Sequence, residues 1–133
     1  MGEADRDRYR DVVVSLAERL AGADAEKAVW DVYAETEKLI AIMKFSLDYE
    51  TPGVFTTLPD ASDPAKLVRD ARELLSKASE QIARGRLVAS IGTLRKSRNS
   101  LRSYLTEKRK SARRAERKAR AAPGKQEGPA TAT

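Results

Sequence analysis

Basic side chains recur at helical spacing in the last third of the sequence. Between residues 95 and 120 the chain has 12 Lys or Arg residues and 2 acidic residues. Because residues three and four positions apart share one side of an α-helix, these cations would form a broad basic face. Such a face can bind phosphate groups. The predicted phosphate-binding residues are Arg95, Lys96, Arg102, Lys108, Arg109, Lys110, Arg113, Arg114, Arg117, Lys118 and Arg120.

The basic residues repel one another along this predicted helix. Four pairs of like charges stand four positions apart between residues 109 and 118. Each pair destabilises an isolated helix by roughly 0.2–0.5 kcal/mol, which totals about 1–2 kcal/mol before salt screening. The helix dipole relieves part of this repulsion near the C-terminus. Two interpretations stay open: a polyanion neutralises the face, or the face is solvated and keeps the protein soluble.

The sequence narrows the kind of anion. No aromatic residue follows Tyr104, so the predicted basic helix has no platform on which bases could stack. Asn99 is the only asparagine, so paired hydrogen bonds to a base edge are poorly supported. These features favour the backbone of DNA or RNA, bound without strong sequence preference. No membrane partner is expected, because the alanine edge of the helix offers no Leu, Phe or Trp for insertion.

Residues that usually perform catalysis are missing. The sequence contains no His and no Cys, which removes common metal ligands, the commonest general base and the thiol nucleophile. Four acidic residues lie near one predicted helix: Asp31, Glu35, Glu37 and Asp48. Helical di-metal sites combine such acids with His, so these carboxylates are expected to form a solvated face. We therefore predict no enzyme activity, catalytic residue, metal site, cofactor or small-molecule substrate.

The net charge is unevenly distributed. Residues 1–84 contain 12 basic and 17 acidic residues, a net charge of −5, whereas residues 85–133 contain 14 and 3, a net charge of +11. A chain of 133 residues with 41% hydrophobic residues suits one folded domain. The pattern indicates an acidic body joined to a basic end.

Apolar spacings of three and four predict four α-helices, over about 5–21, 25–48, 64–84 and 86–122. The expected fold class is all-α, a small antiparallel bundle of about four helices. In the second helix the apolar stripe is wide, which predicts that this helix is central and the most buried. Its main stripe is Val29, Val32, Thr36, Leu39, Met43 and Leu47, widened by Trp30, Tyr33, Ile40 and Ile42.

Local signals mark where the helices begin and end. Gly22 is a predicted stop for the first helix, and Asp24 is the predicted N-cap of the second. Asp63 followed by proline predicts the start of the third helix, because proline suits the first turn. Gly85 is expected to end that helix.

The last helix changes character along its length. An apolar seam with steps of four and three predicts packing against a neighbouring helix, and Arg98 interrupts it. Arg98 is expected to reach the surface or to pair with an acid of the body. Beyond Leu105 the same register holds only Lys and Ala, which bury little apolar area. We therefore predict a bundle over 1–105, a projecting basic helix over 106–122 and a disordered tail over 123–133.

The sequence predicts a long loop with two proline turns over residues 49–63. Val54, Phe55 and Leu58 are apolar residues within it. Two interpretations stay open: they plug one end of the bundle, or they form a docking patch for another protein. The second makes them candidate partner-docking residues.

The composition also bears on the cellular setting. Residues 1–8 are mostly charged and contain no apolar stretch that resembles a signal peptide, so we expect a cytoplasmic protein. One Asn, two Gln and no Cys, with abundant Arg and Glu, are typical of proteins from hot environments. A GC-rich genome produces the same bias.

Residues 71–78 (ARELLSKA), followed by Gly85 and by LVA at 87–89, resemble the generic hairpin of helical-repeat and HEPN-type bundles. The resemblance covers about thirty residues and implies two packed helices. HEPN ribonucleases use an Arg-plus-His motif, and this chain has no His, so the resemblance implies no nuclease activity here.

Two functions compete on this evidence. The first is a non-enzymatic, nucleic-acid-associated accessory protein whose bundle docks on a larger complex while the basic helix contacts phosphates. The second is a protein-interaction or scaffold subunit whose basic helix pairs with an acidic partner or self-associates.

Overall fold

The computed structural model describes residues 2–50 and 58–121. Four α-helices account for most of this part of the chain: α1 (Glu3–Ala21), α2 (Ala25–Ser46), α3 (Pro64–Ala83) and α4 (Leu87–Ala121). The described residues contain no strand. The all-α class and the four helices predicted from the sequence are therefore confirmed.

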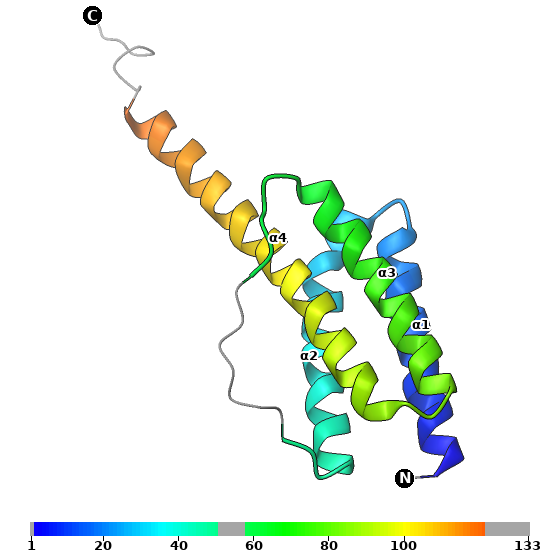
Figure 1. Ribbon diagram of the computed structural model, residues 1–133. Helices are drawn as coiled ribbons and strands as arrows, with labels where there is room; N and C mark the ends of the chain where they lie inside the picture. Colours follow the sequence, from blue (N-terminus) through cyan, green and yellow to red (C-terminus); the bar gives the residue numbers. More distant parts are fainter. Residues whose placement is uncertain (1, 51–57, 122–133) are drawn as a thin grey trace, which may run out of the picture.

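The helices surround one core (Figure 1). α1 packs against α2 and α3, and α4 packs against the same two helices. α1 and α4 run in one direction while α2 and α3 run in the other, so every packed pair is antiparallel. α2 ends at one end of the bundle and α3 begins at the opposite end.

The core is made of aliphatic side chains from all four helices. One face of each helix is apolar because its hydrophobic residues recur every three or four positions. Burial of such side chains is the main source of stability for a bundle of this size. The largest fully buried side chains include Val13, Leu16, Val29, Val32, Met43, Leu75, Ile82, Ile91, Leu94 and Leu101.

Small polar side chains line the contact between α3 and α4. The Ser97 hydroxyl donates a hydrogen bond to the carbonyl oxygen of Ala71 at 2.9 Å. The Thr93 hydroxyl donates to Gln81 Oε1 at 2.7 Å. These bonds satisfy buried hydroxyl groups across the helix interface and fix the register of α4 against α3.

Arg98 interrupts the apolar seam of α4 and pairs across the bundle with an acid of α2. Its Nη1 lies 2.7 Å from Glu37 Oε1. Its Nε and Nη2 donate to Asn99 Oδ1 at 3.2 and 3.1 Å. The prediction that this arginine pairs with an acid of the body is confirmed.

The prediction that α2 is the most buried helix is wrong. The main stripe is largely buried, but Trp30 and Ile42 lie exposed on the outer side of the helix. Tyr33 is half-buried, and only Ile40 of the widening residues is buried. The reason is the arrangement itself: α2 occupies a corner and packs against two neighbours, so its outer side has no helix to cover it.

The predicted boundaries of α3 rest on well-formed caps. Asp63 Oδ1 accepts a hydrogen bond from the backbone N–H of Lys66 at 3.2 Å, and Pro64 is the first helical residue. At the other end Gly85 has a φ of 78°. The N–H groups of Gly85 and Arg86 bond back to the carbonyls of Ile82 and Gln81, which closes a Schellman motif.

The boundary between α1 and α2 differs in its details from the prediction. Gly22 has a φ of −75°, a conformation open to any residue, so glycine is not required there for backbone reasons. Asp24 occupies the N-cap position of α2 but its side chain makes no capping hydrogen bond. The turn therefore closes through backbone bonds, such as that from the N–H of Ala25 to the carbonyl of Gly22.

α2 ends in a second Schellman motif, in which an aspartate takes the glycine position. Asp48 has a φ of 51°, and the N–H groups of Asp48 and Tyr49 bond to the carbonyls of Phe45 and Lys44. A left-handed conformation is unfavourable for a residue with a Cβ, and a negative charge is unfavourable beside a helix C-terminus.

We expect Asp48→Gly to raise the free energy of unfolding by about 1 kcal/mol. Urea denaturation followed by circular dichroism measures this change, and a loss of stability would contradict the assignment.

The described ends of the α2–α3 connection lie against the bundle. The carbonyl oxygen of Pro59 accepts a hydrogen bond from the Ser103 hydroxyl of α4 at 2.9 Å. Leu58, one of the predicted docking residues, has a side chain that is 36% exposed. Val54 and Phe55 lie outside the described residues, as does the predicted tail over 123–133.

Candidate nucleic-acid interface

The candidate interface lies on α4, which extends well beyond the core of the bundle. This helix continues without interruption to Ala121, although Leu105 is the last residue that packs partly against the core. Every residue from Lys108 to Ala121 is exposed. Figure 1 shows this part of α4 running past the ends of the other helices. Alanine and charged residues favour a helix there, but they provide no apolar stripe that would pack against the bundle.

Lys108 lies where α4 leaves the bundle, and it turns toward α2. Its Nζ is 3.6 Å from Glu26 Oε1 and 5.4 Å from the centre of the Tyr104 ring. Burial of the Tyr104 hydroxyl, together with the nearby Glu26 carboxylate, raises the pKa of this tyrosine. Lys108 thus shares a small polar cluster with the body, on the side of α4 away from most other predicted binding residues.

Two further cations pair with the acids of α4 itself. Arg114 Nη2 lies 2.8 Å from Glu107 Oε2, and this hydrogen bond lowers the pKa of Glu107. Arg120 Nη2 lies 3.8 Å from Glu116 Oε2. Both pairs are solvent-exposed, so they contribute little to stability. They do reduce the positive charge at two points along the helix.

The other eight predicted binding residues make no ion pair within the described chain. Five of them lie on the exposed extension, and three lie beside the bundle. Their side chains therefore keep all their hydrogen-bond donors available to an outside anion. They are Arg95, Lys96, Arg102, Arg109, Lys110, Arg113, Arg117 and Lys118.

These eight cations share one side of α4. At roughly 100° per residue they fall within about half of the helix circumference, opposite the side that packs Leu94 and Leu101 into the core. At 1.5 Å per residue the row from Arg95 to Arg117 extends about 33 Å. We call this set of eight residues the α4 basic face. Its spread is comparable to one turn of a nucleic-acid duplex.

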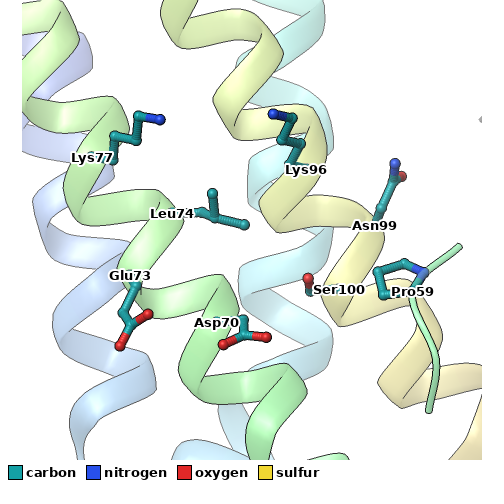
Figure 2. Close-up of a pocket in the computed structure, with 8 residues that line it drawn as sticks. All are labelled: Pro59, Asp70, Glu73, Leu74, Lys77, Lys96, Asn99 and Ser100. Atoms are coloured by element: carbon teal, nitrogen blue, oxygen red, sulfur yellow. The ribbon is translucent and has the colours of Figure 1, made fainter.

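A groove of about 560 Å³ borders the basic face between α3 and α4. Figure 2 shows Lys77 of α3 and Lys96 of α4 at one end of it, and the carboxylates of Asp70 and Glu73 at the other. Leu74 lies between the two ends. The groove therefore adds one cation, Lys77, to the edge of the basic face.

One of the two carboxylates at the other end of this groove is paired within the protein. Asp70 Oδ2 lies 2.8 Å from Lys66 Nζ, and this hydrogen bond raises the pKa of the lysine. Asn99 and Ser100 form part of the α4 wall and are almost fully buried. The groove is thus mixed in charge, whereas the basic face beside it has a single sign.

Sequence reasoning missed two features. Lys77 joins Lys96 only because α3 and α4 pack together, and sequence spacing within one helix cannot show that. The outer side of α2 exposes Trp30 and Phe45, although the wide apolar stripe was interpreted as a sign of burial. The signal that could have identified this surface is an apolar residue that lies outside the main apolar stripe of its helix.

Three of the four acidic residues considered for a metal site are used in ion pairs. Asp31 and Glu35 both pair with Arg19, and Glu37 pairs with Arg98. Within residues 2–50 and 58–121 no group of three or more acidic side chains is placed to hold a metal ion.

In the same part of the chain, none of the helices combines the length and apolar character needed to cross a membrane.

The chain was compared with protein-family models, with curated proteins and with solved structures. None of them matches it.

Proposed function

We propose that this protein is a non-enzymatic, nucleic-acid-associated accessory protein. Its α4 basic face contacts the phosphate backbone of DNA or RNA without strong sequence preference, while its bundle docks on a larger nucleic-acid-processing complex. In this proposal the extension of α4 is a projecting cationic helix, and the bundle serves to position it.

The observation that supports the proposal best is the lack of internal partners for the basic face. Its eight cations have no carboxylate within ion-pair distance in the described chain, although residues 1–84 contain 17 acidic residues. Like charges one turn apart on a helix repel. A polyanion would relieve that repulsion and release its own counterions, so phosphate binding is favoured by both effects.

Backbone contact is favoured over base recognition. Beyond Tyr104 the described part of α4 has no aromatic side chain for stacking. Asn99 is 7% exposed and its Oδ1 accepts hydrogen bonds from Arg98, so its amide is not available for bidentate contact with adenine. Contacts through Lys and Arg to phosphates position a protein on nucleic acid without reading its sequence.

Salt dependence tests this function. If about six of the cations each meet a phosphate, the logarithm of the association constant should fall with the logarithm of salt concentration at a slope near −5 on duplex DNA. Fluorescence anisotropy with labelled duplex DNA, duplex RNA and single strands would measure the slope for each. Similar affinities for unrelated sequences are expected. Undetectable binding at low salt, or a slope near zero, would contradict the proposal.

The exposed apolar surface of α2 favours the second candidate function, a protein-interaction subunit. Phe45 and Trp30 are large apolar side chains exposed on α2, and exposed apolar patches often mark protein-interaction sites. Affinity purification from the native organism, with and without nuclease, separates the two functions. Partners released by nuclease support the nucleic-acid role, whereas partners that stay bound support the protein-interaction role.

A further inference from the structure

Ser111 carries the only side-chain hydroxyl on the extension of α4, residues 108–121. The residue is exposed, and its hydroxyl lies among polar contacts of the same helix. Arg114 Nη2 donates a hydrogen bond to Ser111 Oγ at 3.1 Å, and Ser111 Oγ donates to Glu107 Oε2 at 3.3 Å. Arg114 Nη2 also lies 2.8 Å from that Glu107 oxygen. The hydroxyl therefore lies between a cation and an anion.

The sequence around Ser111 fits the substrates of serine kinases that select basic residues. Lys108, Arg109 and Lys110 stand directly before it, and no other serine or threonine of the chain follows three basic residues. Charge patterns of this kind determine which substrates a kinase accepts. A kinase also needs a segment that opens locally. Opening the helix around Ser111 breaks no buried contact, because every residue of the extension is exposed.

The other hydroxyl residues of α4 lack one or both of these properties. Ser97 follows two basic residues, but it is fully buried and its hydroxyl is bonded to α3. Ser100 and Ser103 are also buried. Thr106 is exposed, but the three residues before it are uncharged. Accessibility and a basic surrounding sequence therefore coincide on α4 at Ser111.

A phosphate on Ser111 would lower the positive charge of the extension. Residues 108–121 contain eight basic residues and one acidic residue, a net charge of +7. A phosphate group adds about −1.5 to −2 at pH 7. At about 100° per residue, Ser111 lies at the edge of the α4 basic face, about 20° around the helix from Lys118. The added charge would therefore repel a polyanion at that face.

The contacts around Ser111 would also rearrange. A phosphate there repels the Glu107 carboxylate, which lies one helical turn away. Arg114 already reaches the Ser111 oxygen, and a doubly charged phosphate attracts a guanidinium more strongly than a carboxylate does. Arg114 would therefore turn from Glu107 to the phosphate. The hydrogen bond from Arg114 lowers the pKa of Glu107, so the loss of this bond would raise that pKa again.

We propose that Ser111 is a phosphorylation site and that its phosphorylation weakens nucleic-acid binding by the α4 basic face. The inference rests on the proposed function. A kinase that selects basic residues would transfer the γ-phosphoryl group of ATP. The bond between the γ-phosphorus and its bridging oxygen breaks, a bond to Ser111 Oγ forms, and ADP leaves with the bonding electron pair. A carboxylate of the kinase accepts the hydroxyl proton.

Two measurements without nucleic acid test the site itself. The full-length protein is incubated with ATP, Mg²⁺ and a purified serine kinase that selects basic residues. Mass spectrometry should place the phosphate on Ser111, and the Ser111→Ala variant should lack it. Carbon resonance of the Glu107 carboxyl should give a higher pKa in the phosphorylated protein than in the unmodified protein. No transfer to Ser111, or an unchanged Glu107 pKa, would overturn the proposal.

Fluorescence anisotropy with labelled duplex DNA at 0.1 M salt tests the effect on binding. Phosphorylation of Ser111 should weaken binding at least tenfold and make the salt slope less negative by about 1 to 2. The control carries a phosphate on Ser15, an exposed residue of α1, and should bind within about threefold of the unmodified chain. Equal losses in the two phosphorylated chains, or no loss in either, would overturn the proposal.

The outcomes separate this inference from the proposed function. If the unmodified chain does not bind duplex DNA at low salt, the proposed function fails and the regulation fails with it, even where Ser111 accepts phosphate. If the unmodified chain binds and the chain phosphorylated at Ser111 binds equally well, the proposed function stands and the inference alone fails.

Discussion

Replacing Arg109, Arg113 and Arg117 together by Gln should weaken binding to duplex DNA by about two to three orders of magnitude at 0.1 M salt. The three side chains belong to the α4 basic face and have no ion-pair partner in the described chain. Each phosphate contact contributes about one unit to the slope of binding against salt, so losing three should make the slope less negative by about 2.7. Anisotropy titrations over a range of salt concentrations measure both quantities.

A charge-matched control separates the α4 basic face from net charge. Arg8, Arg10 and Arg69 are basic residues outside α4, on α1 and α3. Replacing these three by Gln lowers the net charge by the same amount and should change affinity by less than about tenfold. Equal losses in the two triple variants would mean that binding depends on overall charge, and the site assignment would fail.

Leu94→Ala should lower the free energy of unfolding by about 3 kcal/mol. Leu94 is fully buried where α4 meets the core. Truncating a buried leucine removes apolar contact and leaves a cavity, a change that costs about 2–5 kcal/mol. This is a large part of the total stability of a small domain. Urea denaturation monitored by circular dichroism gives the difference.

Leu105→Ala provides the comparison for that experiment. Leu105 is only half-buried at the point where α4 leaves the bundle. Its truncation should cost clearly less than that of Leu94, because less apolar area is returned to water. A loss at Leu94 no larger than at Leu105 would contradict the placement of α4 in the core.

Most of the local structure could be predicted because its causes are local. The cap at Asp63 and the glycine at Gly85 act on backbone groups a few residues away, and both form as expected. The apolar seam of α4 also identified its buried side. Arg98 stood out as a charged residue in that seam, and the bundle then supplied Glu37 as its partner.

The errors concern contacts between helices. The wide apolar pattern of α2 predicts a central, most buried helix, but Trp30 and Ile42 are exposed. The residue pattern shows that a face of a helix is apolar. It does not show whether another helix of the same chain covers that face. The contact of Lys108 with Glu26 and the meeting of Lys77 with Lys96 at one groove also join residues far apart in the sequence. Spacing within one helix holds no information about such pairs.

Nuclear magnetic resonance of the full-length protein, titrated with a short duplex, tests the central claim most directly. Amide signals should shift along α4 from about Arg95 to Ala121, with the largest shifts on the basic face, while signals from α1 stay in place. Shifts centred on α1, or none along residues 108–121 at saturating duplex, would contradict the assignment of phosphate binding to α4.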